Sequence, residues 1–116
     1  MRSPAFEIVA TLGPASFAMA RELARAGLAA AVRPGGRIAV CVGSRGICGI
    51  EPIVRTVVDA LRAAGAQPFV LPAMGSHGAA TAEGQKQVLA AYGITAQSVG
   101  CPVEATMDVV QVDTLE

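Results

Sequence analysis

The chain has 116 residues, of which 53% are hydrophobic and 16% charged, and its nine basic and nine acidic residues balance to a formal net charge of zero. This composition excludes a disordered chain and gives room for one domain with its own hydrophobic core. With one Tyr, three Phe, no Trp and no basic run, the sequence indicates a protein that does not bind nucleic acid. No apolar stretch approaches the ~18 residues of a membrane span, so we expect no membrane association.

The N-terminal part of the chain is difficult to assign. Residues 7–11 can form a short strand. Ser16 can cap a helix over residues 17–31, whose apolar positions recur every three to four residues. We therefore separate residues 1–27, an uncertain segment with a helix, from residues 28–116, which we predict to be an α/β domain.

The first strand of that domain is the unbroken apolar run IAVCV, which predicts a strand over about 38–43. A short, β-branched run between glycines is typical of a strand buried on both faces, so Cys41 is expected in the core. A glycine-rich loop follows at 43–49. Pro52 suits the first turn of a helix, which we expect over about 52–64 because its apolar residues gather on one side.

The same order then repeats. A strand over about 68–72 leads through a second glycine-rich loop at 73–80 into a helix over about 81–92, capped by Thr81, and a last strand is expected at 107–112. The order strand, loop, helix, strand predicts parallel strands. The expected fold class is therefore α/β, with Rossmann-like βαβ units and a parallel sheet. Because no closing helix follows, we expect an incomplete domain of a larger two-domain protein.

The two strand-to-helix loops carry the candidate site. In a parallel sheet both leave the carboxyl ends of their strands, where ligands bind, and each leads into a helix N-terminus that favours anions. Arg45 in the first loop has a forked donor geometry that suits a carboxylate or phosphate, although the loop matches no phosphate-binding motif. His77 in the second loop, the single histidine, can transfer protons. The alternative is a tight turn with a surface arginine, beside a histidine without a catalytic role.

The three cysteines, Cys41, Cys48 and Cys101, are odd in number and include no Cys-x-x-Cys pair. This pattern fits neither a disulfide framework nor a zinc site, and it suits a reducing, cytoplasmic location. One histidine and scattered cysteines give no cluster at metal-ligand spacing, so no metal site is expected in this chain.

Two stretches, IAVCVGSRGICGI at 38–50 and PAMGSHGAATAEGQKQVLAAYGI at 72–94, resemble the N-terminal domain of nickel-pincer-nucleotide-dependent lactate racemases and their relatives. The likeness extends over about residues 28–112, and Gly-Ser-His-Gly followed by a Thr-Ala-Glu helix is its most specific part. The resemblance implies an isomerase domain with a Rossmann-like fold. In that family it faces a C-terminal domain across a cleft, where a nickel-pincer nucleotide racemises a 2-hydroxy acid.

By this resemblance His77 corresponds to a histidine that moves the proton of the substrate hydroxyl. The family's ligand-binding first loop corresponds to Ser44, Arg45 and Gly46. The lactate enzymes have an acidic residue and Thr-Arg-Pro in that loop, and an arginine where this chain has Gly78, so lactate itself is in doubt as the substrate. The family's cofactor lysine and nickel-binding histidine belong to the C-terminal domain. We therefore expect no stable cofactor binding and no activity from this chain alone.

The partners that follow are a small 2-hydroxy acid and either the missing C-terminal domain or a second copy of the chain. A second interpretation belongs to another class, a non-catalytic α/β binding or interaction module from a truncated gene. In both cases the high hydrophobic content predicts a surface that a partner covers.

Overall fold

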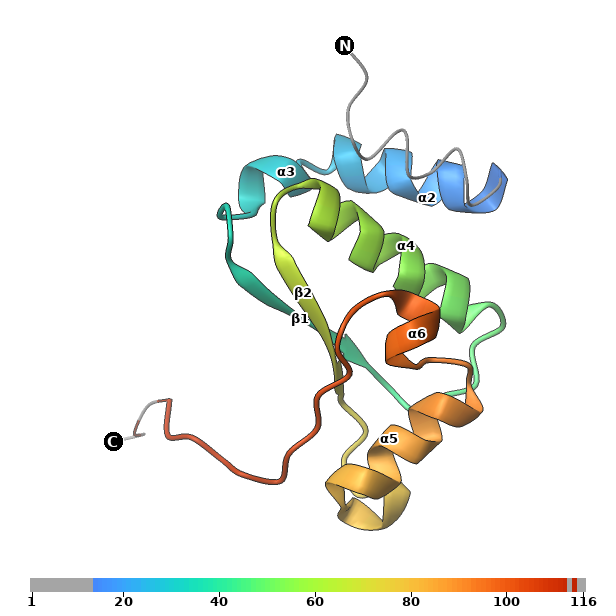
Figure 1. The fold of residues 1–116 in the computed structure, drawn as a ribbon, viewed down its shortest axis with the longest axis vertical. Coiled ribbons are helices and arrows are strands. Elements are labelled where there is room, and N and C mark those ends of the chain that lie inside the picture. The colour runs from blue at the N-terminus through green and yellow to red at the C-terminus, as the bar shows by residue number, and fades with distance from the viewer. Residues whose placement is uncertain (1–13, 113, 115–116) are drawn as a thin grey trace.

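The computed structural model describes residues 14–112 and residue 114 (Figure 1), and it has a mixed α/β fold. Short apolar segments between glycine and proline turns form the strands, and segments with helical periodicity form the helices. The elements follow in the order α2 (Pro14–Arg25), α3 (Leu28–Ala31), β1 (Arg37–Val42), α4 (Ile50–Ala63), β2 (Gln67–Pro72), the 3₁₀ turn η1 (Gly78–Ala80), α5 (Ala82–Ala91) and α6 (Ala96–Val99).

The sheet consists of β1 and β2, which are adjacent and parallel. Their register places Arg37 opposite Gln67 and Val42 opposite Pro72. Helix α4 connects the two strands and is followed by Gly65, whose φ of 93° is a conformation that glycine adopts without strain. The predicted βαβ unit with neighbouring parallel strands is confirmed, with boundaries one or two residues from those expected.

The core lies on the side of the sheet where α4, α5 and α6 pack (Figure 1). Alternate side chains of each strand point to this side, and the apolar residues of α4 meet them at helical spacing. The buried cluster contains Val42, Val54, Val58, Val70, Met74, Leu89, Ile94, Val99 and Cys101.

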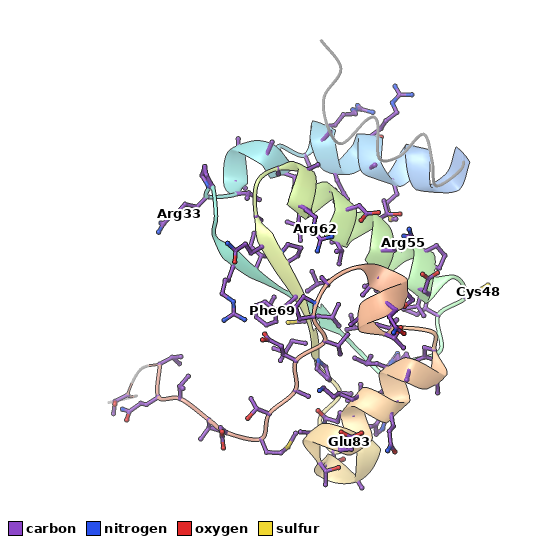
Figure 2. The ribbon with its side chains drawn as sticks, in the orientation of Figure 1. Arg33, Cys48, Arg55, Arg62, Phe69 and Glu83 are labelled. Atoms are coloured by element: carbon purple, nitrogen blue, oxygen red, sulfur yellow. The ribbon has the colours of Figure 1, made fainter. Side chains whose placement is uncertain are left out.

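The other side of the sheet, which we call the open face, has no described helix against it. Arg37, Ala39 and Cys41 of β1 are exposed there. Phe69 of β2 lies on the same side (Figure 2), with the Arg37 guanidinium 4.5 Å from its ring centroid. The prediction that β1 is buried on both faces, with Cys41 in the core, is therefore wrong. An unbroken apolar run gives both faces apolar side chains, but helices pack against only one of them.

The predicted helix over 17–31 is two helices. Gly27 has a left-handed φ of 83° and separates α2 from α3. Because α2 begins at Pro14, Ser16 lies inside the helix, and the prediction that Ser16 caps the helix is wrong. Helix α2 packs along α4 (Figure 1). The strand predicted at 7–11 lies outside the described residues.

The strand predicted at 107–112 is wrong, because this segment has no regular secondary structure. Strand-like pairing occurs earlier, where Val103 forms an isolated parallel bridge with Val70. The Val70 N–H donates to the Pro102 carbonyl oxygen at 2.8 Å, and the Glu104 N–H donates to the Val70 carbonyl oxygen at 2.9 Å. The composition of 107–112 suits a strand, but no described strand lies beside it to supply hydrogen bonds.

Candidate functional site

Two loops leave the carboxyl ends of the neighbouring strands: the first loop, residues 43–49, and the second loop, residues 73–80. The Ala73 N–H donates to the Val42 carbonyl oxygen at 2.8 Å, so the hydrogen-bonding ladder continues to the start of both loops. Gly43 lies so close that a Cβ at its position would be 3.7 Å from the Ala73 carbonyl oxygen. The loops therefore meet at the edge of the sheet where parallel α/β folds bind ligands.

Ser44 and His77 join the two loops by a direct side-chain contact. The Ser44 hydroxyl oxygen forms a hydrogen bond with Nδ1 of His77, although the residues are 33 positions apart. Ser44 is half-buried and His77 is exposed, so a solute can reach the pair. The tautomer of the imidazole decides which group donates. Among the described residues Nε2 of His77 has no hydrogen-bond partner, which leaves it available to a ligand.

Arg45 and Gly46 lie in the first loop, and within the described residues neither forms a hydrogen bond with His77. Arg45 is exposed, and within residues 14–112 its side chain forms no ion pair. Its carbonyl oxygen accepts the Ile47 N–H at 2.9 Å in a tight turn. A Cβ at Gly46 would be 4.0 Å from the Tyr92 ring. That Arg45 and His77 bind one ligand together stays a prediction.

Gln85 of α5 and Tyr92, which directly follows α5, hold the two loops, and the sequence did not reveal this role. Tyr92, directly after α5, donates its hydroxyl proton to the Ser44 carbonyl oxygen at 2.5 Å. Gln85 donates from Nε2 to the Gly75 carbonyl oxygen at 2.8 Å and to the His77 carbonyl oxygen at 3.3 Å. The available signal was a glutamine four positions before Leu89, on the apolar side of a predicted helix.

The backbone after His77 adopts an unusual conformation. Gly78, Ala79 and Ala80 are all left-handed, with φ values of 67°, 58° and 54°. This conformation costs a non-glycine residue roughly 1–2 kcal/mol. It packs on the start of α5, where a Cβ at Gly84 would be only 1.9 Å from the Gly78 carbonyl oxygen. Thr81 caps α5 as predicted, because its hydroxyl oxygen accepts the Gly84 N–H at 3.0 Å.

A hollow of about 570 Å³ lies beside the second loop, between η1 and α5. Its lining does not include Ser44, Arg45 or His77. We place the candidate site at the loop tips, because proton-transferring groups face each other there. The lining of the hollow consists of Gly78, Ala79, Thr81, Glu83, Gly84, Gln87, Val88 and Ala91.

The described groups with displaced pKa values lie away from these loops. Burial raises the pKa of Asp59 on α4, and the nearby Arg55 and Arg62 oppose this effect. Burial is also the largest cause of the raised pKa of Cys101, which follows α6. Neither side chain contacts Ser44 or His77, so the candidate site does not use them.

No protein-family model, curated protein or solved structure matches the chain. The resemblance to nickel-pincer racemases therefore rests on the two quoted stretches alone. Within the described residues, no helix has the length and apolar character that crossing a membrane requires.

The residues present do not fit the attachment of a nickel-pincer nucleotide. Within the described part of the chain, no three His, Cys, Asp or Glu side chains gather where they could hold a metal ion. Lys86, the only lysine, lies exposed on α5 and lines a different hollow of about 300 Å³ with Glu83 and Ile94. Such a cofactor would need its lysine and metal ligands from elsewhere, and we derive no step through it.

Proposed function

We propose that this chain supplies the acid–base half of a 2-hydroxy acid racemase- or epimerase-like protein, and that it is inactive alone. The observation that carries the proposal is the contact between Ser44 and His77 at the carboxyl ends of neighbouring parallel strands. Racemisation of a 2-hydroxy acid through its keto form requires removal of the hydroxyl proton, which an imidazole can accept, and of the hydride on C2. A hydride acceptor that this chain does not supply would have to take up that hydride and return it, so the chain alone would be inactive. The resemblance to nickel-pincer lactate racemases supports this role for His77.

In the proposed chemistry, the second loop binds the hydroxyl group of the ligand and the first loop binds its carboxylate. Neutral His77 donates its Nδ1 proton to the Ser44 hydroxyl oxygen, so the Nε2 lone pair accepts the proton of the ligand hydroxyl. Arg45 binds the ligand carboxylate through its forked guanidinium, and the N-terminal N–H groups of α4 add to the attraction for an anion. A positioned proton-transferring group typically contributes about 10²–10⁴ in rate.

Binding to the isolated chain tests the proposal without the cofactor. We would titrate the ¹⁵N-labelled chain with both enantiomers of several small 2-hydroxy acids, lactate included, and record amide NMR spectra. The expected result is shifts at Ser44, Gly46 and His77. Propionate, which has the carbon skeleton of lactate but no hydroxyl group, is the matched control and should bind more weakly.

Two variants sharpen this titration. Arg45→Lys should weaken binding roughly tenfold, because an ammonium group cannot reproduce two parallel hydrogen bonds. His77→Ala should keep most of the carboxylate binding but lose the preference for lactate over propionate. Shifts confined to other parts of the chain, or equal shifts with propionate, would overturn the proposal.

The second candidate function is a non-catalytic interaction module. It is favoured by the open face and by apolar residues after Val103 that have no described cover, since Val109 and Val112 are each 92% exposed. Sedimentation over a range of concentrations tests it. A stable dimer that binds no 2-hydroxy acid would favour this candidate over the first.

A further inference from the structure

One side of α5 contacts both loops of the candidate site. Gln85 and Tyr92 are seven positions apart, about two helical turns, so they lie on the same side of the helix. Leu89, between them, is fully buried in the core with Val70 of β2. Gln85 bonds to the second loop and Tyr92 to the first. A single anchored element therefore fixes how the two loops lie relative to each other.

Gln85 is only 5% exposed, and burial of its side-chain amide is costly unless the amide is hydrogen-bonded. Its Nε2 atom carries two protons, and it donates to the Gly75 and His77 carbonyl oxygens. An apolar residue could fill this buried position on α5 without any need for hydrogen-bond partners. The glutamine instead holds the backbone on both sides of Ser76, directly at His77.

Tyr92 acts in the same way on the first loop. Its hydroxyl group bonds to the Ser44 carbonyl oxygen, and its ring lies against Gly46. Ser44 and His77 are thus each held through their own carbonyl group, while their side chains meet. The side chains of Gln85 and Tyr92 donate to backbone carbonyl oxygens and not to the imidazole itself, so their influence on the imidazole passes through the backbone.

We propose that Gln85 and Tyr92 are positioning residues, which keep Nδ1 of His77 on Ser44 and Nε2 open to a ligand. This inference rests on the proposed function of His77 as the proton acceptor. The left-handed backbone of residues 78–80 supports it. Such a conformation persists only where surrounding contacts impose it, and without them relaxation of this segment would carry His77 away from Ser44.

The test compares Gln85→Met and Tyr92→Phe in the 116-residue chain. Methionine fills the volume of glutamine without its donors, and phenylalanine removes only the hydroxyl group. The readout is the ratio of the two His77 tautomers, from imidazole ¹⁵N chemical shifts in neutral to mildly alkaline buffer. Each variant should change this ratio by about fivefold, the equivalent of one hydrogen bond. Gln87→Met, an exposed glutamine on the same helix, is the matched control and should leave the ratio unchanged.

The outcomes separate this inference from the proposed function. An unchanged tautomer ratio in Tyr92→Phe and in a folded Gln85→Met overturns the positioning role, even if 2-hydroxy acids bind at the loops. A changed ratio in a chain that binds no 2-hydroxy acid keeps the positioning role and overturns the function. If Gln85→Met does not fold, the loss of one hydroxyl in Tyr92→Phe decides the matter alone.

Discussion

Both faces of the β1–β2 sheet carry apolar side chains, but the two faces differ in what covers them. On the covered face, Val42 and Val70 are buried against α4 and α5. On the open face, Ala39 and Cys41 are exposed, and Arg37 lies over Phe69 while it forms an ion pair with Glu104 at 2.7 Å. The apolar pattern of a strand therefore does not decide its burial, because burial also requires an element that packs against it.

The difference has a consequence for function. The candidate site lies at the end of the sheet. Helix α5, which packs on the covered face, and Tyr92 after it hold the two loops by hydrogen bonds, so the site does not depend on the open face. The open face combines exposed Ala39 and Cys41 with the Arg37–Glu104 ion pair, and a partner can cover it. Two measurements test how different the two faces are in solution, and a third concerns a carboxylate on α4.

The largest expected difference is in the rates at which the three cysteines react with a thiol reagent. Cys41 on the open face and Cys48 in the first loop (Figure 2) are exposed, whereas Cys101 is buried in the core. Cys101 should react about a thousandfold more slowly with a disulfide reagent, since it becomes accessible only when the fold opens, and its raised pKa lowers the thiolate fraction further. Cys41→Ser and Cys48→Ser assign the two fast phases. If Cys41 reacts as slowly as Cys101, a partner copy covers the open face.

A matched pair of leucine truncations compares the two faces energetically. Leu89 is fully buried, and Leu71 is half-buried on the open face, opposite Cys41 in the register. Leu89→Ala should lower the free energy of unfolding by about 2–5 kcal/mol, and Leu71→Ala by less than half of that, because less apolar surface is lost. Urea unfolding followed by circular dichroism measures both. Equal losses would contradict the distinction between a covered and an open face.

The sequence was sufficient to predict where most helices and strands lie, but insufficient to predict which elements pack against them or pair with them. Glycine and proline at the ends of apolar runs located β1, α4, β2 and α5 within one or two residues. The break at Gly27 was missed, because a single glycine inside a helical pattern is usually tolerated. The strand expected at 107–112 failed because pairing depends on a neighbouring strand, which composition does not reveal.

The site could be predicted to the level of its loops. Parallel strands place the ends of β1 and β2 together, which brought Ser44 and His77 into one region. Their contact, and the hydrogen bonds from Gln85 and Tyr92, depend on side-chain directions fixed by the packing of α5. Periodicity gives the side of a helix on which a residue lies, but it does not give its hydrogen-bond partner.

The smallest effect concerns Asp59, which lies on α4 behind the covered face. Its side chain is 19% exposed, and Arg55 Nε lies 3.9 Å from its carboxylate. Burial raises its pKa despite Arg55 and Arg62, so the folded state binds the proton more tightly than the unfolded state. The resulting contribution to stability is present in acid, below the unfolded pKa, and is lost as pH rises through the folded pKa.

Asp59→Asn, which removes this ionisation, should therefore stabilise the fold by less than about 1 kcal/mol at neutral pH, and the gain should shrink in acid. Urea unfolding at neutral and acidic pH measures the gain. Glu22→Gln, in the exposed pair with Arg25, is the control that should show no such trend. A loss of stability in Asp59→Asn at neutral pH would mean that attraction to the two arginines outweighs the cost of burial.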